Sequence, residues 1–180
     1  GGTITTSPRL ARWNGSAWSG VGGGVNSTPL AFATFDDSTG NALVVAGNIT
    51  SVGPSGDAAA TSRLAKWNGT SLSSLGRGIS GAINAMVELT GGTHTLLAVG
   101  DFTRAGNRST EGVATWNGSA WTILGSSAFN VVPVSAAEFN GSIYVGGNFT
   151  TYGAATVRRG ITRHEITQCT VEFVENRGPQ

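Results

Sequence analysis

One segment of about 50 residues recurs along the chain, and this internal repeat constrains the fold more than any other feature. A Trp-Asn-Gly tripeptide begins at Trp13, Trp67 and Trp116. A second motif, Gly-(Asn/Asp)-(Ile/Phe)-Thr, begins at Gly47, Gly100 and Gly147, with a degenerate copy at Gly2. Self-similarity at a fixed period is typical of propellers and solenoids, in which every repeat forms one supersecondary unit. The sequence therefore predicts an array of small, similar units.

Each repeat is predicted to form four strands. The first is an apolar run, the second ends in the glycine motif, the third carries the tryptophan, and the fourth follows the Asn-Gly pair. An Asn-Gly pair between strand-like runs indicates a type I′ hairpin, in which both central residues have a positive φ. Helix-forming residues are scarce, with one Lys and one Met, so we expect no helix. Apart from the tryptophan runs, strands are predicted at Ala17–Val21, Leu30–Phe35, Ala42–Ala46, Leu72–Leu75, Ile83–Leu89, Leu96–Val99, Ala120–Leu124, Val134–Phe139 and Ile143–Val145.

The predicted fold class is all-β and β-propeller-like, with four-stranded antiparallel blades repeating about every 50 residues in a segment of a larger propeller. The alternative is a closed four-blade ring that lacks one strand. The repeats cover residues 1–165, as a partial unit 1–22 and units at about 30–76, 83–125 and 134–165. Residues 166–180 lack the motifs and are expected to form a divergent strand or to begin a further segment. Because the repeat is already under way at Gly1, the natural N-terminus is expected to lie upstream.

Tryptophan recurs at two positions of the repeat. Side chains alternate along a strand, so the tryptophans of the tripeptide are expected on one face of each sheet, buried between neighbouring units. Trp18 and Trp121 occupy a second position, on the fourth strand, where the remaining repeat has Leu72. If they are exposed, these two rings are candidates for stacking on sugars. Leu72 favours the other interpretation, in which this position packs between units, because stacking needs a flat ring.

The tripeptide, the following Leu-Gly pairs and the run Tyr144-Val-Gly-Gly-Asn-Phe-Thr150 resemble kelch-like β-propeller repeats of large secreted or cell-surface proteins. Similar repeats occur in bacterial surface proteins and in fungal cortical polarity-marker proteins. The resemblance covers about residues 1–165. It implies an extracellular, non-enzymatic propeller module inside a longer polypeptide, and it carries over no catalytic residue.

The charge balance argues against several classes of partner. Eleven Lys and Arg residues and ten Asp and Glu residues give a net charge of +1. This balance provides no basic surface of the kind that binds nucleic acid or an anionic membrane. No apolar run approaches the length of about 18 residues that a membrane helix needs, so no membrane insertion is expected. Cys169 is the only cysteine, which excludes an internal disulfide and leaves a buried thiol or a bridge to another chain.

The sequence contains no pattern that indicates catalysis, a metal site or a cofactor. His94 and His164 stand at different positions of the repeat, so they do not form a repeated pair. No Gly-x-Ser-x-Gly nucleophile motif occurs, and the glycine-rich runs separate strands instead of opening a helix around a phosphate. We therefore expect neither enzyme activity nor a bound cofactor.

Asn-x-Ser/Thr sequons are more frequent than the composition alone predicts. Two interpretations remain open: repeated turn chemistry, or N-glycosylation in a secretory pathway. Three sequons belong to the tripeptide turn, two belong to the glycine motif, and Asn26 and Asn107 lie in variable loops. The eight candidate acceptors are Asn14, Asn26, Asn48, Asn68, Asn107, Asn117, Asn140 and Asn148.

Two functions are consistent with these observations. The first is an extracellular or cell-surface structural and interaction module, a scaffold whose partners are other protein subunits or further repeats of the same chain. The alternative is a lectin-like propeller that binds carbohydrate through Trp18 and Trp121. An open array exposes apolar faces and strand edges at its two ends, so we expect it to act within a larger assembly.

Overall fold

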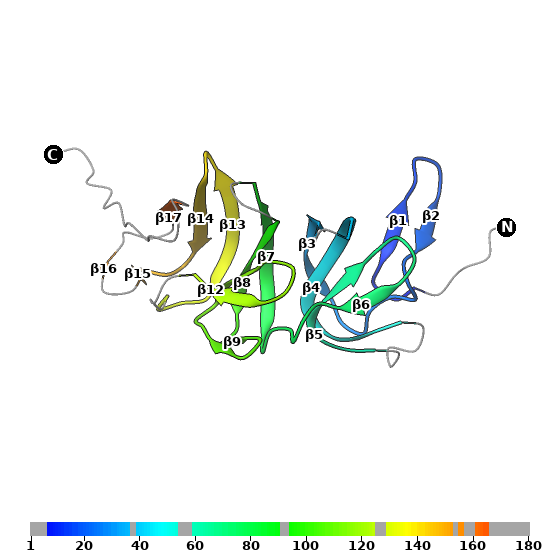
Figure 1. Ribbon diagram of the computed structural model, residues 1–180, viewed down its shortest axis with the longest axis horizontal. Coiled ribbons are helices and arrows are strands. Elements are labelled where there is room, and N and C mark those ends of the chain that lie inside the picture. The colour runs from blue at the N-terminus through cyan, green and yellow to red at the C-terminus, as the bar shows by residue number, and fades with distance from the viewer. Residues whose placement is uncertain are drawn as a thin grey trace.

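The computed structural model describes residues 7–36, 39–53, 59–90, 94–124, 129–152, 155–156 and 161–165. These residues form short strands and turns without a helix, as predicted, and the sheets stand side by side along the long axis of the molecule (Figure 1). None of the described segments is an apolar helix of the length that crosses a membrane. The strands are β1 (Ala11–Trp13), β2 (Trp18–Gly20), β3 (Pro29–Asp36), β4 (Asn41–Val52), β5 (Ala59–Trp67), β6 (Leu72–Ser74), β7 (Ala82–Leu89), β8 (Thr95–Asp101), β9 (Arg104–Ala105), β10 (Arg108–Ser109), β11 (Val113–Trp116), β12 (Trp121–Ile123), β13 (Pro133–Phe139), β14 (Ser142–Gly147), β15 (Thr151–Tyr152), β16 (Ala155–Thr156) and β17 (Ile161–Glu165).

Two repeats form complete four-stranded antiparallel sheets, which confirms the predicted strand order. We call β3-β4-β5-β6 unit 2 and β7-β8-β11-β12 unit 3. In each unit the tryptophan strand lies between the second and fourth strands. Trp116, for example, is opposite Leu96 of β8 on one side and Trp121 of β12 on the other.

The outer repeats are represented by fewer strands. Unit 1 is the two-stranded sheet β1-β2, and unit 4 is the three-stranded sheet β13-β14-β17. Between the glycine motif and the tryptophan strand the repeats differ in length, and this segment contains the small ribbons β9-β10 and β15-β16. In units 3 and 4 this segment thus forms ribbons apart from the packed sheets, whereas in unit 2 it extends β4 and β5, which pair as far as Val52 and Ala59.

Apolar side chains fill the space between successive sheets. Phe35, Val44 and Leu64 of unit 2 share one buried cluster with Ile83 and Leu96 of unit 3. The second strands are buried on both faces, which explains their continuous apolar sequences, because a strand covered on one face alone alternates apolar and polar residues. Each complete unit therefore contributes to two clusters, one on either face.

The tripeptide turns correct the predicted hairpin geometry. Trp13 pairs with Trp18, so four residues form the loop, and Gly15 alone within it has a positive φ, of 102°. The Asn14 Oδ1 accepts hydrogen bonds from the backbone N–H groups of Ser16 and Ala17, both at 2.9 Å. This side-chain cap replaces the backbone geometry of a type I′ turn. The loops beginning at Asn68 and Asn117 are capped in the same way.

The predicted type I′ geometry does occur at a different Asn-Gly pair. Asn140 and Gly141 join β13 to β14 with φ values of 49° and 71°. Here Phe139 pairs directly with Ser142, so the two residues form the entire loop. A two-residue loop has no room for a side-chain cap across the turn, and the backbone therefore adopts the left-handed conformation at both positions.

Candidate functional site

The tryptophan of one unit packs against a glycine of the unit before it. Gly22 and Gly76 have φ values of 55° and 56°, in the left-handed region. A Cβ atom at Gly22 would lie 2.7 Å from Cζ3 of Trp67, and one at Gly76 would collide with Cη2 of Trp116. Both the backbone conformation and the contact with the ring therefore require glycine. This repeated contact joins units 1, 2 and 3.

In unit 3, the tripeptide tryptophan Trp116 and the fourth-strand tryptophan Trp121 lie between the packed sheets. The two side chains are 5% and 4% exposed, and their ring centroids are 5.3 Å apart at an interplanar angle of 49°. Burial between units confirms the prediction for Trp116. It corrects the suggestion that Trp121 stacks on sugars, because neither ring has a face open to solvent.

The equivalent pair in unit 1 has the same geometry and a different environment. Trp13 and Trp18 have centroids 5.5 Å apart at 49°, yet they are 50% and 70% exposed. The expected burial of Trp13 is therefore wrong, because the described residues place no sheet against its face of unit 1. Trp67, which packs against the smaller unit 1, is partly buried. Of the two candidate stacking residues, Trp18 alone is accessible.

Unit 4 exposes the complementary face of the repeat. Phe35, Leu89 and Phe139 occupy equivalent positions. Each is paired with the second-strand residue that lies five places before the first glycine of the glycine motif in the same unit. Phe35 and Leu89 are buried by the following unit, whereas Phe139 is 63% exposed beside Tyr144. The outward faces of units 1 and 4, which we call the end faces, thus expose positions that are buried between the inner units.

Glutamates on the first strands hydrogen-bond to the preceding unit. The Glu88 carboxylate accepts from Thr34 Oγ1 at 2.9 Å and from the backbone N–H of Asp36 at 3.4 Å. Glu138 accepts from Oγ1 and the backbone N–H of Thr90, at 3.0 and 2.5 Å. Asp36 and Thr90 are equivalent residues at the ends of β3 and β7. These contacts were not predicted from the sequence, although Glu recurs at one position of the repeat, as Glu88 and Glu138.

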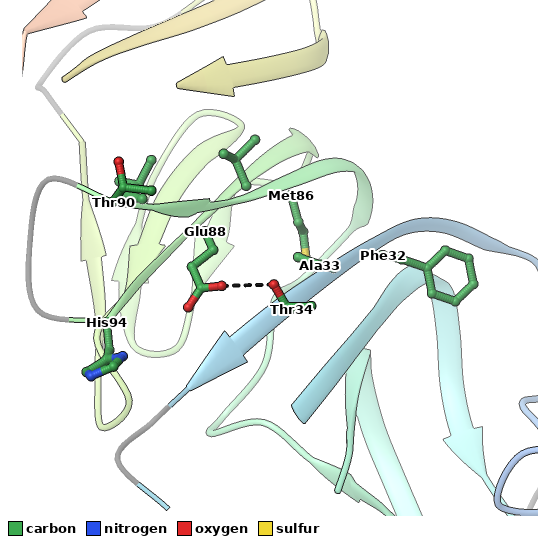
Figure 2. Close-up of a pocket in the computed structure, with 9 residues that line it drawn as sticks. Phe32, Ala33, Thr34, Met86, Glu88, Thr90 and His94 are labelled. Carbon is green, nitrogen blue, oxygen red and sulfur yellow. Dashed lines mark hydrogen bonds between the residues drawn. The ribbon is translucent and has the colours of Figure 1, made fainter. Parts of the chain in front are cut away.

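A pocket of about 530 Å³ lies between β3 and β7 (Figure 2). Phe32 and Met86 form apolar parts of its wall, and the hydrogen bond between Glu88 and Thr34 crosses it. His94 lines it from the turn before β8. Nowhere in the described ranges do three His, Cys, Asp or Glu side chains gather in a way that could hold a metal ion.

All eight sequon asparagines are exposed on the surface. Asn26 is hydrogen-bonded through both side-chain atoms, and its Nδ2 donates to Thr50 Oγ1 at 2.7 Å. Asn48 accepts from Arg63. Three turn asparagines, Asn14, Asn68 and Asn117, use Oδ1 alone in the hydrogen bonds of the described structure. The Nδ2 atom, which carries the glycan in N-glycosylation, therefore makes no hydrogen bond to another described residue in these three exposed side chains.

Several predicted features lie outside the described residues. These are Cys169 and the rest of 166–180, the degenerate glycine motif at Gly2, and the side chain of His164, whose backbone pairs with Ile143. Comparison of the chain with protein-family models, with curated proteins and with solved structures gave no match in any of the three.

Proposed function

We propose that this chain is a non-enzymatic, extracellular scaffold built from kelch-like propeller repeats, and that it binds other polypeptides through its end faces. The supporting observation is the contrast between equivalent positions. Phe139 is exposed where Phe35 and Leu89 are buried, and Trp13 is exposed where Trp116 is buried. Apolar surface of this kind is stabilised by contact with another chain or another repeat.

The regular contacts between units support a scaffold role. The glycine–tryptophan contact joins unit 1 to unit 2 and unit 2 to unit 3, and the glutamate hydrogen bonds join unit 2 to unit 3 and unit 3 to unit 4. Interactions of this nearest-neighbour kind allow repeat arrays to present extended binding surfaces. Within the array of described sheets, the end faces are the surfaces at which this series of contacts is interrupted.

The extracellular assignment is supported by the exposed sequons. A free Nδ2 at a tight turn, as at Asn14, is accessible to a glycosylating enzyme, and a glycan there would extend away from the sheets. The turn chemistry itself gives a reason for Asn at these sites, so glycosylation is a part of the proposal that is tested separately.

A lectin-like function has one specific observation in its favour, the exposed indole of Trp18. An accessible, rigid aromatic face is suited to stacking on a sugar ring. The equivalent residues Leu72 and Trp121 are partly or fully covered, so this surface occurs once in units 1 to 3. A glycan array probed with the wild-type chain and with Trp18→Ala tests the alternative, and binding that the substitution abolishes would favour the lectin.

Site-specific photocross-linking tests the scaffold proposal. A photoreactive phenylalanine analogue replaces Trp18 or Phe139 at the two end faces, or Ile123 on β12 of the inner unit 3 as an exposed control. The full chain is irradiated in the cells or secretions that produce it. We expect adducts with other polypeptides at Trp18 and Phe139 and none at Ile123. Equal adducts at all three positions, or none at either end face, would contradict the proposal.

A further inference from the structure

One edge of β1 differs from the equivalent edges of the other tryptophan strands. β5 pairs with β4 and β6, and β11 pairs with β8 and β12, whereas β1 pairs only with β2 within the described residues. The Asn14 N–H donates to the Ala17 carbonyl, so the antiparallel alternation directs the backbone of Arg12 towards β2. The N–H and C=O groups of Ala11 and Trp13 therefore point to the opposite side, which we call the β1 edge.

The β1 edge already has the backbone shape of a paired strand. The residue four places before the tripeptide tryptophan is left-handed in all three units, with φ values of 65° at Arg9, 76° at Arg63 and 83° at Gly112. In unit 3 this residue bonds to the glycine motif, because Gly100 N–H donates to the Gly112 carbonyl and Gly112 N–H donates to Phe102. A left-handed conformation is uncommon for arginine, so its recurrence at Arg9 shows that unit 1 retains the conformation used for pairing.

Two exposed apolar side chains occupy repeat positions that pack against a neighbouring strand or unit where the repeat is complete. Trp13 is exposed on β1 itself, and Phe32, 53% exposed, is on β3 of the neighbouring unit 2. The equivalent residue of Phe32 is Met86, which is 8% exposed and belongs to the same buried cluster as Val44, on the second strand of the preceding unit. If unit 2 packs on that strand as unit 3 packs on unit 2, a strand added beside β1 would bring alternate side chains next to Trp13 and next to Phe32.

We infer that the β1 edge binds, by strand addition, an extended segment of another polypeptide that has the pattern of the repeat's own second strand. Such a segment is an apolar run that ends in Gly-(Asn/Asp)-x-Thr. The described structure contains this pairing three times, as β4 beside β5, β8 beside β11 and β14 beside β17. Arg9, which donates to the Val25 carbonyl in this structure, favours a motif with Asp, like that at Asp101, because its equivalent in unit 2, Arg63, donates to Asn48 of the glycine motif.

This inference rests on the proposed scaffold function and identifies the partner of one end face. Backbone hydrogen bonds along the edge would provide affinity, and the two apolar side chains would select alternating apolar residues. Folded copies of this chain already use β4, β8 and β14 within their own sheets, so the donor is a segment that is not paired in its own structure.

The test uses a fluorescent synthetic peptide with the sequence of residues 95–104, Thr-Leu-Leu-Ala-Val-Gly-Asp-Phe-Thr-Arg, titrated with the full chain. Its control is the same peptide with Ala98→Pro, which removes an N–H from the new ladder. In unit 3 Ala98 is opposite Ala114, the equivalent of Ala11. We expect saturable binding of the first peptide and at least about tenfold weaker binding of the control.

Hydrogen exchange locates the contact. On addition of the peptide, the amides of Ala11 and Trp13 should become protected, whereas that of Arg12, already directed at β2, should change little. An Ala11→Pro chain, with its fold verified by circular dichroism, should lose peptide binding. Equal binding of both peptides, protection elsewhere, or no binding at about 1 mM peptide would overturn the inference. Cross-links at Trp18 and Phe139 in the same circumstances would leave the scaffold function standing.

Discussion

Replacing the same repeat tryptophan inside the stack and at its end separates the contribution of the inter-unit contact from that of the strand itself. Trp116 is 5% exposed and touches Gly76, whereas Trp13 is 50% exposed. A buried tryptophan removes about 200 Å² from water, worth about 5 kcal/mol at about 25 cal/mol per Å². Trp116→Ala should therefore lower the free energy of unfolding by about 3–5 kcal/mol. Trp13→Ala, which leaves no cavity enclosed by another unit, should lower it by less than about 1.5 kcal/mol.

The free energy of unfolding of both variants is measured by urea unfolding. The transition is followed by circular dichroism, because tryptophan fluorescence itself changes with the substitution. For a chain of this size, a loss of 1 kcal/mol lowers Tm by about 2–4 °C, so Trp116→Ala should melt roughly 6–20 °C below the parent. Trp67→Ala, at the partly buried position, should fall between the other two. Equal losses for Trp13→Ala and Trp116→Ala would refute the reasoning, because they would show that contact with the preceding unit contributes nothing.

Three further predictions test the other repeated contacts. Gly76→Ala should lower the free energy of unfolding by about 2–5 kcal/mol, through backbone strain and collision with the Trp116 ring. The control is Gly69→Ala, at a left-handed glycine in open space, which should lower it by about 1–2 kcal/mol. Equal losses for the two variants in chemical denaturation would contradict the glycine–tryptophan contact. Glu138→Ala should lower the free energy of unfolding by about 1–2 kcal/mol, and Glu138→Gln should lower it less, because glutamine still accepts from the Thr90 N–H. If calorimetry finds no loss of stability for the alanine variant, the glutamate hydrogen bond does not stabilise the contact between units. Mass spectrometry of native material should find glycans at the turn sequons, Asn14 among them, and bare sequons throughout would remove the glycosylation proposal.

Local physical chemistry made much of the architecture predictable from the sequence. The first strand of unit 3 was predicted at Ile83–Leu89 and forms β7, because an apolar run between turns leaves the backbone few other ways to satisfy its hydrogen bonds. Gly22 and Gly76, each nine residues after a tripeptide tryptophan, were visible in the sequence as one repeat position. Their contacts with tryptophan rings were not visible, because each ring belongs to the next unit along the chain.

The turn geometry was decided by a competition that sequence rules of thumb do not resolve. An Asn-Gly pair is compatible both with a type I′ hairpin, as at Asn140, and with a capped four-residue loop, as at Asn14. The choice depends on which residues pair across the loop. Trp13 opposite Trp18 brings two large rings together, and this pairing leaves four residues to close the turn.

The period, the all-β character and the positions at which the repeats differ in length follow from the sequence, since each depends on residues close together in the chain. Which members of a repeated position are buried depends instead on the packing of one unit against the next. Trp13 and Trp116 have nearly identical neighbours in sequence and the same ring geometry with their partners, yet one is exposed and the other enclosed. Burial depends on what lies across the face of the sheet, and that surface comes from a unit about 50 residues away.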